Sequence, residues 1–288
     1  MADQLEAVAP LLDGVAETLL LPLYIRAVES QRPDALLQDQ KAVELIEKLQ
    51  GVLEYDWLAR VKQVKVDDED RVGIALRSRE FDRRTADFLA RNPGAIVVHI
   101  GCGLDTRFER IRSALEDQSS LRAWHDLDLP QVIELRRALI GGEEARYHHL
   151  ACSVFDTTWM ETLEVQRPVL FLAEGVMMYF EPGQVKRLVL ALAGHFPGSE
   201  LVFDAFSPYL VFMNNLRLSI TKIGARYHWG LTHGRDLEGW GTGIRLMDEW
   251  RYFDSPEPRL DHIRWMRHIP FLANSSSIFQ YRLETDVP

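Results

Sequence analysis

One short apolar run that ends in a glycine-rich turn constrains this chain more than any other feature. Residues 96–100 read Ile-Val-Val-His-Ile, and Gly101 and Gly103 follow at once, with Asp105 two positions further on. This pattern is typical of a buried parallel strand whose carboxyl end meets a nucleotide-like ligand. The glycines permit a close approach of ligand and backbone because they carry no Cβ. The chain should therefore contain a Rossmann-like β–α unit that begins near residue 95.

The residues after the two glycines discriminate between ligands. A dinucleotide fingerprint would carry a third glycine where Thr106 stands. A carboxylate at Asp105, at the start of the next helix, would repel a pyrophosphate and attract a ligand ammonium. S-adenosylmethionine (SAM) carries an ammonium and no phosphate, so it fits better than a nicotinamide cofactor. Two alternatives stay open: a nicotinamide-dependent oxidoreductase, and an ordinary glycine-rich turn with Asp105 as a helix N-cap.

Charge and cysteine content exclude several classes of partner. The 288 residues carry a formal net charge of −10 without a long basic run, which disfavours nucleic acid and hence an RNA methyltransferase. Two cysteines form neither a disulfide framework nor a zinc set, so we expect no metal. The apolar run 19–21 stops at Pro22 and is too short to cross a membrane. We expect a cytoplasmic protein without membrane association, and the oligomeric state stays open.

Strands and helices alternate from residue 95 onwards, which predicts an α/β protein with a doubly wound sheet. Residues 1–94 are mostly helical in pattern and predict a helical cap, while 95–288 form the main domain. The segment 208–250 is rich in aromatic residues and predicts a mostly helical insertion on the substrate side. The expected strands are 95–100, 121–127, 146–152, 169–173, 201–204 and 277–283, and the expected helices of this part are 105–116, 130–140 and 182–195.

Acidic residues stand at the predicted ends of two further strands. Asp126 and Asp128 lie about 25 residues after the glycines, where an acid pairs with ribose hydroxyls in related sheets. We favour Asp128 because it lies nearer the loop. Glu174 directly follows a run of five apolar residues, and a charge there is costly without a partner. In open α/β sheets such strand ends form the ligand site.

Several motifs, in order, resemble the leucine carboxyl methyltransferase family, and within it the tetracenomycin-type polyketide O-methyltransferases. The motifs are Gly-x-Gly-x-Asp-Thr-Arg at 101–107, Asp-x-Asp-x-Pro at 126–130 and Ala-Glu-Gly-Val-x-x-Tyr at 173–179, with further similarity at 32–39, 75–79, 203–208 and 239–243. The resemblance implies a class I SAM-methyltransferase fold. Its seven-stranded sheet is mostly parallel, with an antiparallel last strand, an N-terminal helical cap and a helical insertion after strand five.

The resemblance also implies a set of cofactor contacts. Arg77 would clamp the methionine carboxylate through two parallel hydrogen bonds, and Glu174 would lie near the methionine moiety. The other implied contacts are Gly101 and Gly103 under the adenosine, Asp105 beside them, Asp128 on the ribose and Ser153 beside the adenine. Tyr24 and Arg26 would reach over the cofactor from the cap. His99 departs from the family pattern, and we interpret it as structural.

The implied reaction is methyl transfer from SAM to a carboxylate or phenolic oxygen of a small, polyketide-like molecule. A phenol would gain from a base or from a hydrogen bond to its oxygen. Asp204, at the end of the fifth strand, is the candidate for orienting the acceptor. The substrate pocket is predicted to include Tyr24, Arg26, Met178, Tyr179, Phe206 and His228. The alternative is a catalytically idle protein that binds SAM without transferring its methyl group.

Overall fold

The computed structural model describes residues 16–50, 68–115, 117–164, 166–221 and 226–284. Within them the strands form one seven-stranded sheet of order β3-β2-β1-β4-β5-β7-β6. All neighbouring strands pair in parallel except β7, which runs antiparallel to both β5 and β6. The strands are β1 (Ala95–Ile100), β2 (Leu121–Asp128), β3 (Tyr147–Ala151), β4 (Val169–Ala173), β5 (Ser199–Phe206), β6 (Ile244–Arg251) and β7 (Ser276–Leu283).

The central strands are apolar because helices cover both faces of the sheet. Every residue of β1 and of β4 is buried. Alternate residues enter two separate cores, since successive side chains of a strand point to opposite faces. Val98 and Phe171 pack with helix α9 on one face, and Val97 and Leu170 pack with helix α6 on the other. The helices are α3 (Ala16–Ser30), α4 (Gln40–Gln50), α6 (Asp68–Arg91), α7 (Arg107–Ala114), α8 (Pro130–Leu139), α9 (Pro182–His195), α10 (Pro208–Thr221) and α11 (Pro270–Ala273).

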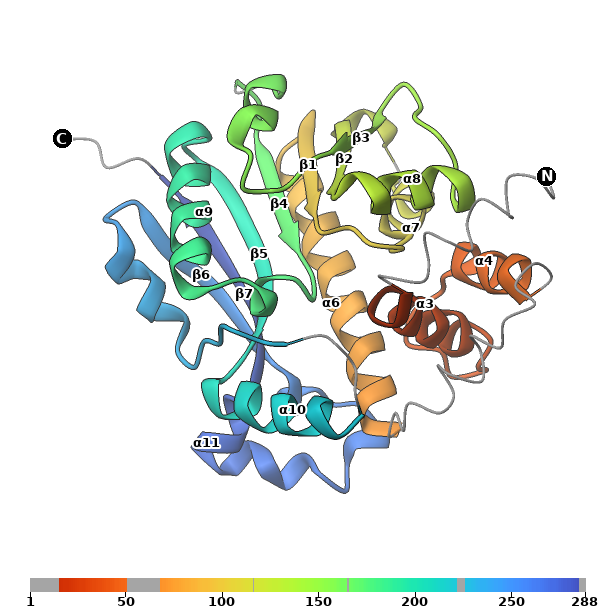
Figure 1. The fold of residues 1–288 in the computed structure, drawn as a ribbon, viewed down its shortest axis with the longest axis vertical. Helices are drawn as coiled ribbons and strands as arrows, with labels where there is room; N and C mark the ends of the chain where they lie inside the picture. The colour runs from red at the N-terminus through yellow and green to blue at the C-terminus, as the bar shows by residue number, and fades with distance from the viewer. Residues whose placement is uncertain (1–15, 51–67, 116, 165, 222–225, 285–288) are drawn as a thin grey trace.

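The helices before the sheet fall into two groups. Helix α6 runs along the sheet (Figure 1), and its Phe81, Phe88 and Leu89 share a core with β1 and β4. Helices α3 and α4 instead pack on each other and on α8, through a separate cluster that contains Leu23 and Leu45. The packing therefore favours a cap that ends before Asp68, whereas the division expected from the sequence fell after residue 94. That division stays a prediction.

The expectation of a mostly helical segment 208–250 was wrong in its second half. Helix α10 and a 3₁₀ helix, Gly234–Trp240, lie in it, but Ile244–Arg251 forms strand β6. This strand lies at the edge of the sheet, and only Ile244 is buried. Asp248, Glu249 and Arg251 interrupt the apolar alternation that marks a strand in a sequence. An edge strand needs no continuous apolar face, so its pattern was missed.

The expected fold class is confirmed: the sheet is mostly parallel and seven-stranded, with an antiparallel β7. Predicted and observed bounds are identical for β1, β4 and α9, and the part of the first predicted helix that the structure describes is α3. The helix expected near 54–63 lies outside the described residues. Among the described helices none is long and apolar enough to cross a membrane. The described residues also contain no group of three or more His, Cys, Asp or Glu side chains that could hold a metal ion.

Candidate functional site

The glycine loop after β1 is held in a conformation that favours glycine. Gly101 has φ 62° and Gly103 has φ 51°, in the left-handed region that other residues rarely adopt. A Cβ on Gly101 would stand 2.4 Å from a methyl group of Val176, and one on Gly103 would stand 2.7 Å from Leu19. Both glycines are thus required by backbone geometry and by neighbouring protein side chains. The sequence interpretation had attributed them to ligand approach alone.

Asp128 reaches this loop at the end of β2. Its carboxylate accepts hydrogen bonds from the backbone N–H groups of Gly103 and Leu129, each at 2.8 Å. Burial raises the pKa of Asp128, and the two N–H donors oppose that rise. Asp126 is instead fully engaged in the core, where it pairs with Arg136 and accepts a hydrogen bond from the Tyr147 hydroxyl. The structure therefore separates the two acids, and Asp128 is the one beside the glycines.

The end of β3 lies next to Asp128. The backbone N–H of Cys152 donates to the Asp128 carbonyl at 3.0 Å, and Ser153 follows directly. The Ser153 hydroxyl accepts from the Phe155 N–H at 3.3 Å, and its carbonyl accepts from the Asp156 N–H at 3.0 Å. These bonds define a turn at the carboxyl edge of the sheet. Ser153 thus lies in the turn that follows β3, one residue after the Cys152 contact with Asp128, and its place beside the adenine stays a prediction.

Arg77 of α6 joins the ends of β4 and β5. Its Nε donates to Glu174 at 3.0 Å, and its Nη1 donates to Asp204 at 3.1 Å. The Ser78 hydroxyl also donates to Glu174, and the Gly175 N–H donates to Asp204 at 2.6 Å. The three sequence-predicted residues Arg77, Glu174 and Asp204 therefore form one partly buried cluster, although they lie up to 127 positions apart.

The two acids of this cluster differ electrostatically. Burial would raise the pKa of Glu174, but the guanidinium groups of Arg107 and Arg77 outweigh it and lower the pKa to about 2. Burial raises the pKa of Asp204, which has Arg77 as its one guanidinium partner among the ion pairs of the described residues. Glu174 is thus firmly ionised, whereas Asp204 is the more weakly compensated acid of the two.

Asp105 is occupied by arginines. Its carboxylate lies 2.9 Å from Arg107, 3.0 Å from Arg110 and 3.7 Å from Arg26. Burial would raise the pKa of Asp105, but these three guanidinium groups hold it well below its usual range. The helix N-cap is Thr106 and not Asp105. The expectation that Asp105 awaits a ligand ammonium therefore needs correction: its charge is already neutralised within the protein.

Arg107 and Arg110 extend these contacts into one buried ion-pair network. Arg107 is fully buried and contacts Glu174, Asp105 and Asp82, the last at 2.7 Å. Arg110 bonds Asp82 at 2.7 Å. We call this set the charged side of the site; it comprises Arg26, Asp39, Arg77, Asp82, Asp105, Arg107, Arg110, Glu174 and Asp204.

Arg26 fastens the cap to the glycine loop. It is 2% exposed and donates to Asp39 at 3.0 Å and to the Leu104 carbonyl at 3.1 Å. Asp39 in turn accepts from the Thr106 hydroxyl and from Arg110, each at 2.7 Å. Arg26 is thus a structural link between the cap and the glycine loop, and its expected place in a substrate pocket stays a prediction.

A second group of side chains comes from the segment after β4, the end of β5 and the segment after α10. The Tyr227 ring lies 5.1 Å from that of Tyr179 and 5.7 Å from that of Phe206. The Met178 carbonyl accepts from the His228 N–H at 2.8 Å, and the His228 imidazole lies 2.8 Å from Glu181. We call Met178, Tyr179, Phe206, Tyr227 and His228 the aromatic side of the site. Four of its five members were predicted from the sequence.

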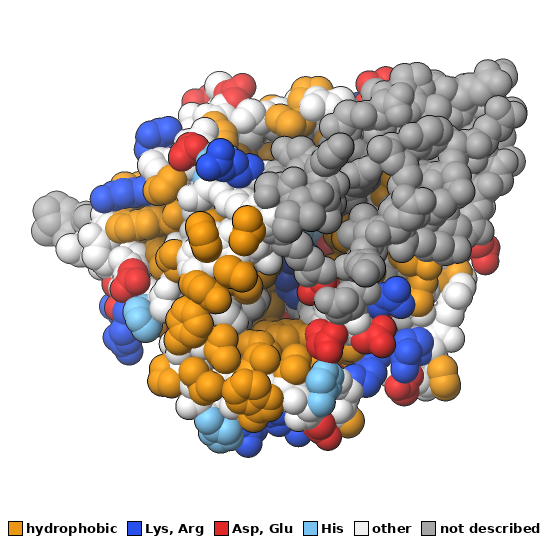
Figure 2. Space-filling model, turned by 60° about the horizontal axis from the view of Figure 1, so that its bottom comes forward, with side chains coloured by type: hydrophobic (Ala, Val, Ile, Leu, Met, Phe, Trp, Pro, Cys, Tyr) orange, Lys and Arg blue, Asp and Glu red, His pale blue; other side chains and the backbone are white. Residues whose placement is uncertain are grey.

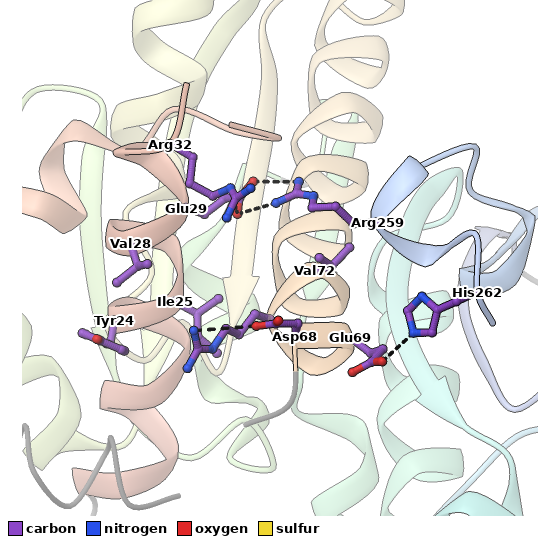
Figure 3. A pocket seen from close by; sticks show the side chains of 11 residues that line it. Tyr24, Ile25, Val28, Glu29, Arg32, Asp68, Glu69, Val72, Arg259 and His262 are labelled. Carbon is purple, nitrogen blue, oxygen red and sulfur yellow. Dashed lines mark hydrogen bonds and ion pairs between the residues drawn. The ribbon is translucent and has the colours of Figure 1, made fainter. Parts of the chain in front are cut away.

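A separate cavity of about 810 Å³ lies between α3, the first turns of α6 and the segment 259–262 (Figure 3). Of the residues predicted to bind ligands, only Tyr24 lines it. Charged groups of its lining pair with one another: Arg259 forms an ion pair with Glu29 at 3.0 Å, and His262 lies 2.7 Å from Glu69. The geometry thus makes this cavity part of the junction between cap and main domain.

Sequence reasoning missed Tyr227 and the roles of Arg107, Arg110 and Asp82. Tyr227 directly precedes His228, which was predicted to line the substrate pocket. This proximity in the sequence was the one signal that could have pointed to Tyr227. Arg107 lay inside the family motif, but nothing in the motif showed which acids it would contact. Ion pairs between residues tens of positions apart depend on tertiary placement, which local pattern does not give.

Solved structures share this fold. A protein of the DUF574 family from Streptomyces avermitilis superposes with a TM-score of 0.58 at 14% identity, over 94% of this chain and 99% of that one. A candidate methyltransferase from Thermobifida fusca gives a TM-score of 0.54 at 16% identity, over 91% and 94% of the two chains. The sheet order with its antiparallel β7 is that of the class I SAM-methyltransferase fold.

Sequence relatives give the family. Residues 20–193 match the model of the leucine carboxyl methyltransferases, and the chain belongs to this family. It is 32% identical to the tetracenomycin polyketide synthesis O-methyltransferase TcmP of Streptomyces glaucescens, over 85% of this chain and 86% of that protein. It is 29% identical to the SAM-dependent methyltransferase dpfgK of Gibberella zeae, over 82% of each. These findings confirm the predicted family and the SAM cofactor, and they decide against the nicotinamide-dependent alternative.

Proposed function

We propose that this methyltransferase transfers the methyl group to an oxygen of a small, largely apolar, polyketide-like acceptor. The observation that carries the proposal is that the two sides lie next to each other at the ends of β4 and β5. Glu174 and Tyr179 follow β4, and Asp204 and Phe206 both lie on β5. The Tyr227 ring lies 5.1 Å from that of Tyr179 and 5.7 Å from that of Phe206. A charged cofactor and an aromatic acceptor would each find complementary groups.

The donor set of the charged side fits the parts of SAM. A guanidinium such as Arg77 suits the methionine carboxylate, and the carboxylates Glu174 and Asp204 suit the ammonium. Asp128 suits a ribose diol because a carboxylate accepts hydrogen bonds from both hydroxyls. We assign Ser153 to the adenine, and Gly101 and Gly103 to the loop under the adenosine. For Asp105 we propose a supporting role through Arg107, since its carboxylate already has three partners.

Arg77 forms ion pairs with both acids of its cluster. An amino-acid zwitterion can exchange partners with this cluster without leaving a buried charge uncompensated. Glu174 and Asp204 would hold its ammonium, and the guanidinium of Arg77 would hold its carboxylate. This exchange matters because an unpaired buried charge is costly. The cluster would thus be preassembled for a ligand that carries both charges.

SAM supplies an activated methyl group on a sulfonium, and the tasks left to the protein are orientation and exclusion of water. A carboxylate acceptor is already ionised at neutral pH and requires no base. For a phenolic acceptor, His228 beside Glu181 is the group placed to take a proton. Burial raises the pKa of Tyr179 and of Tyr227, so both stay neutral and can orient the acceptor as hydrogen-bond partners. The sequence predicted that Asp204 orients the acceptor; in this proposal it instead faces the ammonium and holds Arg77 in place.

An assay with isotopically labelled SAM tests the proposal. Purified protein is incubated with matched polycyclic aromatic acceptors that carry a phenol, a carboxylate or a methyl ether at one position. Label on the phenol or the carboxylate, and none on the methyl ether, is expected and would also decide which oxygen accepts. SAM binding without label on any acceptor would favour the catalytically idle alternative. Label recovered in added RNA would contradict the small-molecule proposal.

A cytoplasmic location belongs to the same proposal. So does the absence of nucleic-acid partners, which rests on the acidic net charge of −10.

A further inference from the structure

Helix α10 presents an apolar stripe to the outside. Tyr209, Phe212, Met213 and Leu216 follow one another at the spacing i, i+3, i+4, i+7, which places them on one helical face. A surface helix normally turns such a stripe towards the core. Here the four side chains are 39% to 65% exposed, while Val211 is buried. The more apolar face of this helix therefore faces outwards.

The stripe continues onto the C-terminal segment. The Tyr209 and Phe271 rings meet edge to face with centroids 4.4 Å apart, and Phe271 and Ile269 are 51% and 40% exposed. Figure 2 shows hydrophobic side chains gathered over the lower part of the face that it draws. We call this surface the α10 face; it consists of Tyr209, Phe212, Met213, Leu216, Ile269 and Phe271. Apolar patches of this kind mark interaction sites in soluble proteins.

We propose that the α10 face is a self-association surface, on which two copies of this chain pack about a two-fold axis. Side chains of this size, about half exposed, contribute roughly 100 Å² each, or roughly 600 Å² for the six. A standard interface buries about 800 Å² per partner, with a polar rim around the apolar core. The six side chains thus supply about three quarters of one side of a standard interface, and a polar rim would supply the rest. An i, i+3, i+4, i+7 stripe can also pack against its own two-fold copy as a helix pair.

Charge favours a second copy over the other occupants. Arg217 is the only charged residue in the sequence of α10, so a strongly charged partner would find little to bind there. Helices that lie on membranes usually carry several Lys or Arg residues on the polar face, and the chain as a whole is at −10. Two copies of this chain carry the same net charge and repel each other least when they meet through surfaces that carry few charges. The helix α10 is such a surface.

The α10 face is also connected to the aromatic side of the site through helix α10 itself. The Asn215 side chain donates to the Tyr227 carbonyl at 2.8 Å and accepts from its N–H at 2.9 Å. A partner packed against the outer face of α10 would therefore stabilise the helix that positions Tyr227.

Sedimentation velocity on the full chain without cofactor tests the proposal, so its outcome does not depend on the proposed function. We expect a dimer for the wild type from low to high micromolar concentration. Met213→Asp and Phe212→Asp should give monomers. Met247→Asp should stay dimeric, because Met247 is 45% exposed, between Met213 at 39% and Phe212 at 65%, but lies on β6 outside the α10 face.

A wild-type chain that stays monomeric over this concentration range would overturn the proposal, whatever the variants do. A dimer that survives both Met213→Asp and Phe212→Asp, with each variant folded by circular dichroism, would also overturn it. Flotation with vesicles of phosphatidylcholine separates the membrane alternative: a monomer that floats with the vesicles would assign the α10 face to lipid.

Discussion

The two sides of the site are built from opposite kinds of contact. On the charged side, buried arginines and carboxylates form a continuous network from the cap to β5, and each member has a defined partner. On the aromatic side, Tyr179, Phe206 and Tyr227 meet through ring contacts at 5.1 to 5.7 Å. Ion pairs demand fixed geometry, whereas ring contacts tolerate changes of shape. The difference suits a site that binds one constant cofactor and a less polar, variable acceptor.

The largest expected effect breaks the charged side at its centre. Arg107→Ala would leave Glu174, Asp105 and Asp82 without their shared partner, and removing one member of a buried ion pair costs about 3–5 kcal/mol. Urea unfolding should show that loss. Arg112→Ala on the same helix is the matched control, since Arg112 pairs with Glu109 and Glu144 at the surface and such pairs contribute about 1 kcal/mol or less. Equal losses in the two variants would contradict the network.

Acid should weaken the charged side first. The arginines lower the pKa of Glu174 from its ordinary value of 4.5 to about 2. A depressed carboxyl pKa stabilises the fold above pH 4.5, and this contribution is lost as the pH falls towards 2. The free energy of unfolding should therefore drop more steeply with acid for the wild type than for Glu174→Gln. Glu161→Gln, at an exposed position, should follow the wild type. If the free energies of unfolding of wild type and Glu174→Gln fell in parallel with pH, the stabilising ion pairs of Glu174 would be contradicted.

Much of this architecture could be predicted from the sequence, and the limits have physical causes. Strands β1 and β4 are buried on both faces, so their apolar runs gave their exact bounds. Strand β6 lies at the edge of the sheet, and its charged residues interrupt the apolar pattern by which a strand is predicted. The strand-end residues Asp128, Glu174 and Asp204 were found because position along a sheet is a local property. The partners of Asp105 were not, since Arg26 and Arg110 reach it only through the packing of the cap.

An intermediate effect is expected for cofactor affinity. Arg77→Ala removes the only guanidinium bridging Glu174 and Asp204 in the described structure, and it should weaken SAM binding tenfold or more, about 1.4 kcal/mol. Isothermal titration calorimetry measures the change. Arg79→Ala, two positions along α6 and exposed, should bind SAM as the wild type does. Unchanged affinity in a folded Arg77→Ala protein would remove Arg77 from the site.

The smallest effect is expected on the aromatic side. Tyr227→Phe keeps the ring contacts and removes one hydroxyl, so the KM for the acceptor should rise less than tenfold, below about 1.4 kcal/mol. The affinity for SAM should not change. Tyr209→Phe, at an exposed tyrosine, should alter neither quantity. A loss of SAM affinity in Tyr227→Phe would mean that the two sides are not functionally separate.

The central claim is that SAM lies across the strand ends beside the glycine loop. Calorimetric titration of SAM into the wild type and into Asp128→Ala tests it most directly, with Asp117→Ala as an exposed aspartate control. We predict at least tenfold weaker binding for Asp128→Ala, about 1.4 kcal/mol, and wild-type affinity for Asp117→Ala. Wild-type affinity in a folded Asp128→Ala protein would contradict the claim and place the cofactor elsewhere.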